Sequence, residues 1–317
     1  SSSLTATRSS LDHTYNLLTM EMLPGTSLVY VIQVESPLQL VGVTNAYHAV
    51  MAKTAGFNAL YLSGSGVATA SYGLPDLGLT TLDNVLEDVR RITAASELPL
   101  LVDVDTGWGG AFMIARTMKE MARAGAAGVH IEDQIQAKRC GHRPGKQIVS
   151  TAEMCDRLKA AADAKAYDDF VLMARTDAIA NEGVDAAIER SVAYVEAGAD
   201  MIFAEAVTEL GDFRKFKEAV GVPVLANLTE FGKTPAFTIE QLSSVGVDIA
   251  LYPLTAFRAA NKAVENALTE IRAAGTQKAI IGDLQTRAEL YEYLEYHIYE
   301  SKLDELFEAE SDHESAN

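Results

Sequence analysis

"RAGAAGVHIED", residues 123–133, runs from the end of a helical pattern through a glycine into a short apolar segment that ends in two carboxylates. Glycine is favoured just past a helix because it readily adopts the left-handed backbone conformation that caps the helix. The same order recurs in "TAGFNALYL" (54–62), "EAGADMIFA" (196–204) and "SVGVDIALY" (244–252). The apolar segments are continuous rather than alternating, which is typical of parallel strands covered on both faces. The repeated unit is therefore a helix followed by a buried parallel strand.

This alternation of helical patterns and short apolar runs extends over most of the chain. The apolar runs are residues 38–43, 59–64, 99–105, 127–133, 170–177, 200–206, 222–230 and 248–254. Eight β–α units in about 240 residues predict a closed (β/α)₈ barrel of the TIM type. An open doubly wound sheet is the alternative, but it normally carries a glycine-rich turn after its first strand. Here the first strand continues into "TNAYHAV", which has no glycine, so the barrel is favoured.

The two ends of the chain lie outside the barrel pattern. We assign residues 1–36 to an N-terminal extension, 37–284 to the barrel and 285–317 to a C-terminal helical segment with an acidic tail. The pattern over 285–307 is helical, with recurring Leu and Tyr, and no strand follows it. Such a helix needs an apolar surface to pack on, either its own barrel or a second subunit.

Composition limits the partners of this protein. The 317 residues include 44 acidic and 26 basic side chains, a formal net charge of −18. A surface of this charge repels nucleic acid and anionic membranes, so we expect neither as a partner. No apolar run reaches the roughly 18 residues that span a bilayer. Two cysteines, Cys140 and Cys155, are too few for a disulfide scaffold and indicate a reducing compartment, for which we take the cytoplasm over the mitochondrial matrix.

Acidic residues follow the third and fourth strands at the end of the barrel where such enzymes place their chemistry. Asp103 and Asp105 are two positions apart, so in an extended strand both would point to the same side. Two neighbouring carboxylates repel unless a proton or a cation neutralises them, and carboxylate oxygens are typical Mg²⁺ ligands. Asp76 and Glu132 could add contacts directly or through water. A solvated strand end is the other explanation of the Asp103/Asp105 pair.

The segment "KRCGHRPGK", residues 138–146, concentrates positive charge in an otherwise acidic chain. It forms the loop after the fourth strand, so it would lie beside the acidic pair and bind an anionic substrate; a merely solvated loop is the alternative. Cys140, flanked by glycine and cations, is poorly placed for a structural role, whereas Cys155 falls on the apolar side of a helical pattern. His142 could titrate near neutrality.

"KRCGHRP" after "HIEDQ", with "DVDTGWGG" and "YLSGSG" upstream, resembles the isocitrate lyase / phosphoenolpyruvate mutase superfamily. The likeness covers about residues 37–307, and the Lys-[Lys/Arg]-Cys-Gly-His loop is highly specific. Isocitrate lyases usually have Lys where this chain has Arg139, and their chains are much longer. Ser65 stands where the family often has Gly, and the stretch before Pro37 differs from the family's usual N-terminus.

The resemblance implies a carbon–carbon lyase that cleaves a small tricarboxylate, 2-methylisocitrate, to pyruvate and succinate in the methylcitrate cycle of propionate catabolism. It implies Mg²⁺ at Asp103 and Asp105, with Asp76 and Glu132 nearby, and a homotetramer that exchanges its C-terminal helical segment between subunits. It assigns catalysis to Cys140, Tyr61, Lys138 and His142. The substrate contacts that it implies are Ser63, Gly64, Ser65, Gly141, Arg175, Glu205, Asn227, Leu228, Thr229, Arg258 and Arg287.

Roles within this reaction follow from what a retro-aldol cleavage needs. A base must take the hydroxyl proton, a cation must hold the developing keto acid, and an acid must protonate the succinate carbanion. Cys140 is the candidate acid. Tyr61 or a metal-linked carboxylate is the candidate base. Other activities stay open: an isocitrate lyase, another superfamily enzyme acting on an α-keto acid, or a metal-binding barrel without catalysis.

Overall fold

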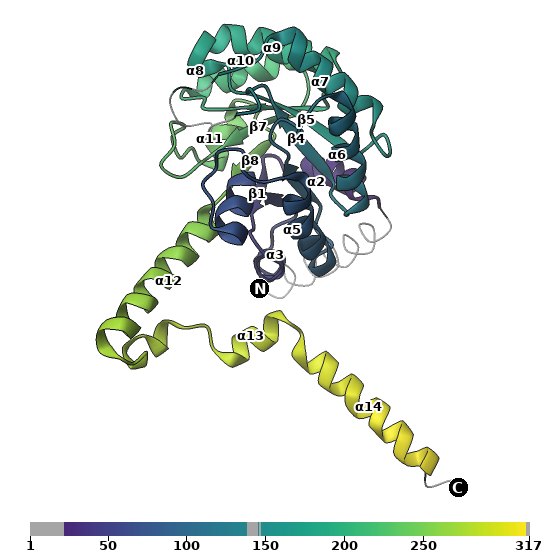
Figure 1. Cartoon of the computed structure of the whole chain (residues 1–317), viewed down its shortest axis with the longest axis vertical. Helices are drawn as coiled ribbons and strands as arrows, with labels where there is room; N and C mark the ends of the chain where they lie inside the picture. Colours follow the sequence, from purple (N-terminus) through teal and green to yellow (C-terminus); the bar gives the residue numbers. More distant parts are fainter. Residues whose placement is uncertain (1–21, 138–144, 146, 315–317) are drawn as a thin grey trace, which may run out of the picture. The chain divides into compact units, whose positions relative to one another are not determined.

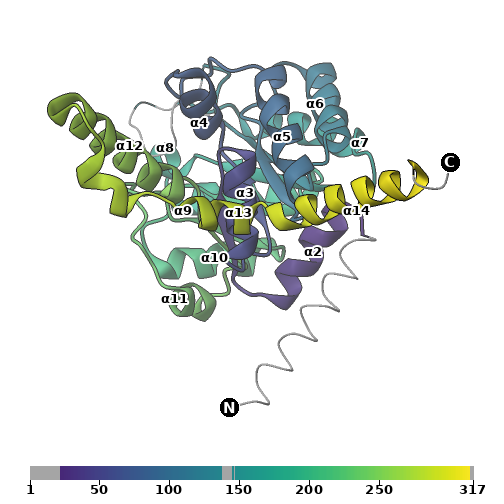
Figure 2. The same cartoon turned by 90° about the horizontal axis from the view of Figure 1, so that it is seen from below.

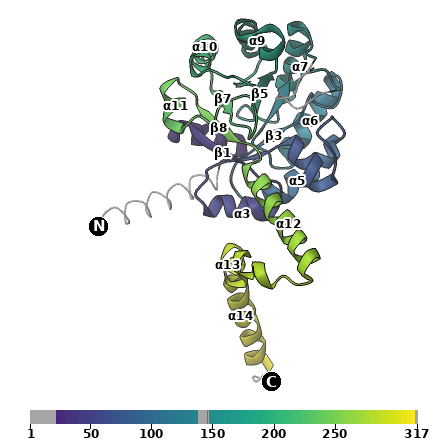
Figure 3. The same cartoon turned by 90° about the vertical axis from the view of Figure 1, so that its left-hand side faces the viewer.

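The computed structural model describes residues 22–137, 145 and 147–314. Among them, eight parallel strands pair in chain order and β8 pairs with β1, so the sheet closes into a barrel. Figure 3 shows these strands at the centre of a ring of helices. The strands are β1 (Leu38–Gly42), β2 (Leu60–Leu62), β3 (Leu100–Asp103), β4 (Gly128–Glu132), β5 (Val171–Thr176), β6 (Met201–Ala204), β7 (Val224–Asn227) and β8 (Ile249–Tyr252). The predicted (β/α)₈ barrel is confirmed, and each predicted apolar run contains one strand.

Helices follow the strands on the outside of the barrel. They are α3 (Ala46–Thr54), α5 (Leu82–Ala95), α6 (Ala111–Arg123), α7 (Thr151–Asp163), α9 (Val184–Glu196), α10 (Leu210–Val220) and α11 (Ile239–Ser244), with the shorter α4 (Gly64–Gly66), η1 (Val67–Ser71) and α8 (Ile179–Glu182) in the loops. Gly56, Gly125, Gly198 and Gly246 end the four helices of the repeated phrase, with φ of 92°, 91°, 113° and 80°. The left-handed conformation expected from that phrase is present at all four sites.

The strands separate two apolar layers. Inward-facing side chains fill the barrel, and among them are Leu38, Leu40, Leu101, Met173, Phe203, Leu225 and Leu251. Outward-facing side chains pack against the helices in a second, larger cluster. Covering both faces explains why the strands are nearly continuous apolar runs in the sequence. At the C-terminal ends of the strands the inward-facing positions become polar, and this is where the candidate site lies.

Helix α2 (Pro24–Val34), drawn in purple in Figure 2, closes the barrel at the end where the strands begin. Its Leu28, Val31 and Ile32 belong to the cluster that fills the barrel interior. At Gly25 the chain passes so near the β5 side that a Cβ atom would lie 2.1 Å from the backbone oxygen of Asp169. The described part of the N-terminal extension therefore belongs to the barrel core.

Contacts between Cα atoms divide the chain into two units, residues 1–258 and 259–317. Helix α12 (Thr255–Ala274) leads into the second unit, which also contains η2 (Lys278–Asp283), α13 (Arg287–Tyr293) and α14 (Tyr296–Glu314), labelled in Figure 1 except for η2. The single helical run predicted over 285–307 is wrong in one respect. It is interrupted between α13 and α14, where Glu295 has a φ of 52°.

The second unit does not bury its own apolar side chains. On α12, Val264, Leu268 and Ile271 recur on one face and are 54%, 63% and 46% exposed. Exposed apolar side chains also occur along α14. In the part of the chain that the structure describes, no helix is long and apolar enough to cross a membrane.

Candidate active site

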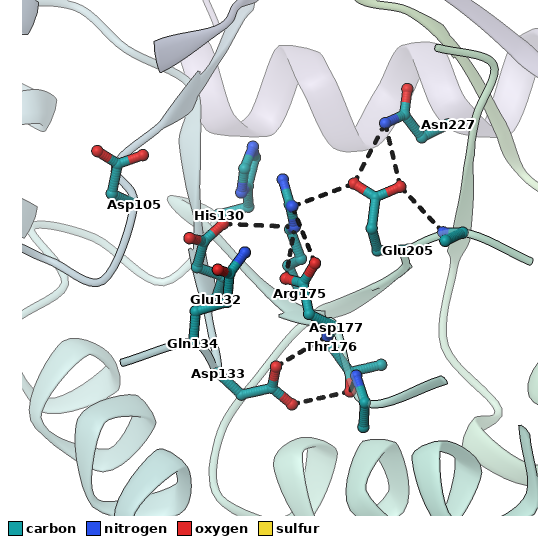
Figure 4. Close-up of polar contacts among 12 residues, drawn as sticks. Asp105, His130, Glu132, Asp133, Gln134, Arg175, Thr176, Asp177, Glu205 and Asn227 are labelled. Atoms are coloured by element: carbon teal, nitrogen blue, oxygen red, sulfur yellow. Dashed lines mark hydrogen bonds and ion pairs between the residues drawn. The ribbon is translucent and has the colours of Figure 1, made fainter. Parts of the chain in front are cut away.

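Five inward-facing polar residues stand at the C-terminal ends of consecutive strands β3 to β7. They are Asp103, Glu132, Arg175, Glu205 and Asn227, and each is between 0 and 7% exposed. Figure 4 shows Glu132, Arg175, Glu205 and Asn227 directed toward the same space. They occupy the inward-facing positions above the apolar filling of the barrel, so the strand register itself brings them together.

Arg175 is the centre of this group. Its Nε and Nη2 donate to Asp177 at 3.0 and 3.1 Å, Nε lies 3.4 Å from Glu132, and Nη2 lies 3.2 Å from Glu205. Burial by itself lowers the pKa of Arg175, but the negative charges of these three carboxylates outweigh it and raise the pKa well above its ordinary value. The guanidinium is therefore permanently charged and held in one orientation.

Glu205 is itself fixed on three sides. Asn227 donates to both of its carboxylate oxygens at 3.3 Å, and the backbone N–H of Ala206 donates to Oε1 at 2.9 Å. Ala206 has a φ of 62°, a left-handed backbone conformation that is uncommon for a residue other than glycine. The carboxylate thus meets Arg175 with its position already set.

Asp103 and Asp105 lie together, but not by the geometry that an extended strand provides. Strand β3 ends at Asp103, and Asp105 follows with a φ of 50°, so the predicted extended backbone is wrong at this residue. The two side chains nevertheless approach Gly64, where a Cβ atom would lie 3.0 Å from Asp103 Oδ2 and 3.2 Å from Asp105 Oδ1. The backbone N–H of Gly64 also donates to Asp103 Oδ2 at 3.0 Å. A larger residue at position 64 would crowd both carboxylates, which would have to shift by a few tenths of an ångström.

This arrangement suits a hard divalent cation bound largely through water. Asp103 and Asp105 are 4% and 6% exposed, and two buried neighbouring carboxylates need a counter-charge. Among the residues that the structure describes, no group of three or more Asp, Glu, His or Cys side chains is arranged to enclose a metal. Mg²⁺ is usually held by one or two carboxylates while it keeps several waters, so the pair fits this ion. Asp76 lies in the loop between η1 and α5, partly exposed, and its part in a metal site stays a prediction.

Tyr61 lies deeper than an open strand end would place it. It is 2% exposed, and its hydroxyl is 2.8 Å from Nε2 of His130 on β4. The same nitrogen is 3.7 Å from Asp103 Oδ1. His130 was not among the predicted site residues, although its position two residues before Glu132 on one strand gives it the same inward direction.

The other predicted substrate contacts lie at four places, of which two are in the loops after β2 and β7. Ser63 and Gly64 are buried beside Asp103, Ser65 is half-buried in α4, and Ser63 Oγ accepts from the N–H of Gly66 at 3.4 Å. Leu228 is buried directly after β7, and Thr229 next to it is partly exposed.

Arg258 and Arg287 are the last two predicted contacts. Arg258 lies near Glu230 at 3.5 Å, with its guanidinium 5.6 Å from the ring centre of Phe231. Arg287 begins α13 in the second unit.

Four predicted residues, Lys138, Cys140, Gly141 and His142, fall outside the described residues. The structure describes the segments on either side of them. The backbone N–H of Ile135 donates to Gln147 at 3.0 Å, and that of Val149 donates to Asp133 at 2.8 Å. These bonds form an antiparallel stem from which the loop leaves and to which it returns.

The sequence is similar to a known protein family and to several curated proteins. The phosphoenolpyruvate phosphomutase family model matches residues 31–272. A 2-methylisocitrate lyase of Vibrio cholerae is 59% identical, covering 91% of this chain and 96% of that protein. Another of that name from Escherichia coli is 60% identical, covering 90% and 96%.

Two solved structures have a similar fold. The crystal structure of 2,3-dimethylmalate lyase matches with a TM-score of 0.81 at 33% identity, covering 88% of this chain and 94% of that one. Phosphonopyruvate hydrolase in complex with oxalate and Mg²⁺ matches with a TM-score of 0.77 at 28% identity, covering 88% and 98%. With a family match over most of the barrel and relatives near 60% identity, this chain belongs to the phosphoenolpyruvate phosphomutase family.

Proposed function

We propose that this protein is a Mg²⁺-dependent carbon–carbon lyase that cleaves 2-methylisocitrate to pyruvate and succinate. The observation that carries the proposal is the near-60% identity, over about nine-tenths of the chain, to proteins named 2-methylisocitrate lyase. The mouth of the barrel supports it, because it joins a candidate cation site to a fixed guanidinium. The reaction would belong to the methylcitrate cycle of propionate catabolism, in the cytoplasm.

The charge at the mouth is consistent with an anionic substrate only if further cations are present. The mouth of the barrel holds five buried carboxylates and one buried guanidinium, a formal charge of −5 + 1 = −4. The carboxylates are Asp103, Asp105, Glu132, Asp177 and Glu205, and the guanidinium is that of Arg175. A divalent cation leaves −2, which still repels a tricarboxylate. We expect the basic segment 138–146, which follows β4 in the sequence, to supply this positive charge.

Asp103 and Asp105 would hold the Mg²⁺. Bound there, the ion supplies positive charge that stabilises the developing keto acid and lowers the pKa of the hydroxyl group that loses its proton. Glu132, the last inward-facing residue of β4, would take part through water.

Arg175 would bind a carboxylate of the substrate. Its Nε and Nη2 are taken by Asp177 and Glu205, whereas Nη1 donates no hydrogen bond among the described residues. A guanidinium offers five N–H donors in a fixed fork, so one edge can serve the protein and another the substrate. Arg258, 46% exposed in its side chain, is the second candidate for a substrate carboxylate.

Proton transfer requires an acid and a base at the two ends of the broken bond. Cys140 would deliver the proton to the succinate carbanion, with Lys138 and His142 beside it in the sequence. The burial of Tyr61 and its hydrogen bond to His130 favour an indirect role for Tyr61, in which it fixes the imidazole near Asp103. The base is then a carboxylate at the mouth of the barrel.

The assembly that we propose is a homotetramer in which the C-terminal helical segment packs on a neighbouring subunit and brings Arg287 toward the site. The exposed apolar side chains of α12 and α14 support this arrangement, because exposed apolar surface of this kind is typical of protein–protein contacts.

Pyruvate release from 2-methylisocitrate with Mg²⁺ tests the proposal. We expect turnover that a chelator abolishes and added Mg²⁺ restores. Isocitrate lacks one methyl group, and a pocket built around that methyl gains about 1–3 kcal/mol from it, so isocitrate should be a poor substrate. A higher kcat/KM for isocitrate would indicate an isocitrate lyase. Turnover only of an α-keto acid would indicate another enzyme of the family. No turnover of any of these substrates would indicate a metal-binding barrel without catalysis.

A further inference from the structure

The stem of the loop after β4 is held from outside the barrel by two arginines. Arg157 of α7 donates from Nη1 to the backbone oxygens of Glu132 and Gln134 at 3.2 and 2.8 Å, which fixes the outgoing limb. Arg190 of α9 donates from Nη1 to the backbone oxygen of Val149 at 2.9 Å, which fixes the returning limb. Each limb therefore has its own cationic support.

Arg190 is held more firmly than a surface arginine. It is 7% exposed and forms a two-point ion pair with Glu182 of α8, with both N–O distances at 2.7 Å. The hydrogen bond to Glu182 raises the pKa of Arg190, although burial opposes the increase. A bidentate pair fixes the plane of the guanidinium as well as its position.

Asp133 joins this support to the stem and to the active site. It is fully buried, and Tyr194 of α9, which also accepts from Arg190 at 3.2 Å, donates to its Oδ2 at 2.8 Å. Thr176 donates to the same oxygen, and the backbone N–H of Asp177 donates to Oδ1, both at 2.8 Å. Figure 4 shows Asp133 beside Thr176, on the far side of the Arg175–Asp177 pair from Glu205.

A continuous chain of contacts thus runs from α9 to the substrate-binding region. Arg190 donates to the hydroxyl of Tyr194, which donates to Asp133, and Arg190 Nη1 itself lies 3.9 Å from Asp133 Oδ2. Asp133 accepts from the backbone N–H of Asp177, and the side chain of Asp177 binds Arg175 at two points. A buried carboxylate with one neighbouring guanidinium is weak support for stability, because desolvation offsets most of the attraction. The desolvation cost of burying Asp133 is explained if the network fixes the positions of Arg175 and the stem.

We propose that Arg190 is a positioning residue for the reaction, which acts through Asp133 and Val149 to fix Arg175 and the stem of the loop that carries Cys140 relative to each other. The role rests on the proposed lyase function, since it presumes that groups on that loop and Arg175 act on the same substrate. None of Arg190, Tyr194 or Glu182 needs to touch the substrate.

Arg190→Met and Arg190→Lys, with Tyr194→Phe as a milder change, test the proposal. Misplacing reacting groups by about 1 Å costs about 10²-fold, so Arg190→Met should lower kcat/KM by about that factor. Arg190→Lys should recover part of the loss, because the charge remains but the two-point pair does not. Lys217→Met is the matched control. Lys217 also joins a helix to a carboxylate and a backbone oxygen, Asp248 and Val222 at 2.8 and 3.2 Å, but these lie where strands β7 and β8 begin. It should lower the melting temperature and leave kcat/KM unchanged.

Alkylation of the two cysteines by iodoacetamide, read by peptide mass spectrometry, separates positioning from a loosened helix. Cys155 Sγ lies 3.6 Å from the backbone oxygen of Ala193, one turn along α9 from Arg190, and so reports on the helix itself. In Arg190→Met, the alkylation rate of Cys140 should change by at least about threefold while that of Cys155 stays the same.

Unchanged Cys140 alkylation and unchanged kcat/KM in folded Arg190→Met would overturn the proposal. A parallel increase at both cysteines would also overturn it, because it would show that α9 is loosened as a whole. If Arg190→Met does not fold, Arg190→Lys and Tyr194→Phe carry the same comparisons. If the wild-type chain releases no pyruvate, the lyase function fails, and the alkylation rates still decide whether Arg190 positions the stem.

Discussion

At the scale of single residues, Arg175 shows how the site uses one cation to organise several anions. Three carboxylates surround it, and Asp177 contacts it at two points. A lysine at this position would keep the charge, but it could not reproduce a planar two-point contact while still offering an edge to the substrate.

We therefore expect Arg175→Lys to lower kcat/KM by about 10²-fold, because lysine keeps the charge but loses the two-point contact, and misplacing a substrate-binding group by about 1 Å costs about that factor. Steady-state pyruvate release measures the loss, and circular dichroism checks the fold. Arg91→Lys is the control, since Arg91 pairs with Glu87 and Asp88 on the exposed side of α5 and its side chain is 58% exposed. If Arg175→Lys retained wild-type kcat/KM, Arg175 would not be a substrate contact.

Cys140 is the residue on which the proton-transfer step depends. Cys140→Ser should preserve substrate binding because size and polarity change little, but a serine hydroxyl is far less acidic than a thiol near pKa 8.5. Loss of a general acid typically costs about 10²–10⁴-fold, so kcat should fall by that range while KM changes little.

Cys155→Ser is the control for this change. Burial raises the pKa of the Cys155 thiol, and the side chain lies half-buried on α7 against α9, so this variant should stay active. A fully active Cys140→Ser enzyme would remove the thiol from the mechanism.

Several of the predicted site residues lie together because they occupy inward-facing positions at the C-terminal ends of neighbouring strands, which the order of strands in a barrel predicts. Glu132 and Asn227 end their strands and Arg175 lies one residue before the end of β5, and Figure 4 shows the three side chains directed toward the same space. Asp103 ends β3 beside them in the barrel. His130 was missed because it lies two residues before the end of β4, at a position that the sequence alone does not distinguish from one in the apolar filling of the barrel. The contact of Arg190 with Val149 could not be predicted, because it depends on how a helix packs against a loop 41 residues earlier.

At the scale of elements, the repeated helix–glycine–strand phrase was the pattern that predicted the barrel. Each of its four glycines caps a helix with positive φ, and each following strand joins the barrel. Two elements were not predicted in their actual form. Helix α2 has an apolar face like any core helix, and only its packing identifies it as the plug of the barrel. The break at Glu295 requires a left-handed backbone at a residue type that gives no signal for one.

Gly25 at the start of α2 tests whether the plug is tightly fitted. In Gly25→Ala the new Cβ would lie 2.1 Å from the backbone oxygen of Asp169, so helix or loop must move. Overpacking of this kind costs about 1–3 kcal/mol, and the free energy of unfolding in urea should fall by that amount. Gly211→Ala at the start of α10, where nothing lies within 4 Å, should be neutral or slightly stabilising. Equal stability of the two variants would show that α2 adjusts freely.

At the scale of the whole molecule, the two units differ in what they bury. The unit of residues 1–258 encloses two apolar layers, whereas none of the described side chains of α12, α13 and α14 is fully buried. Apolar side chains recur along these helices, and most of them stay exposed. The chain as a whole carries −18, so any self-association must overcome repulsion through such apolar contacts.

Deleting residues 285–317 tests whether these helices hold the assembly together. The deletion removes α13 and α14, with Leu294, Ile298, Leu303, Leu306 and Phe307 between 43% and 64% exposed. If the helices pack on a neighbouring subunit, the truncated chain should have a lower mass by light scattering and a lower kcat/KM, since Arg287 is lost with them. A shorter deletion of residues 308–317 removes most of the acidic tail but leaves these apolar side chains in place, so it should change neither. A chain cut at 285 that kept its mass and its full activity would show that the C-terminal helices serve neither assembly nor catalysis.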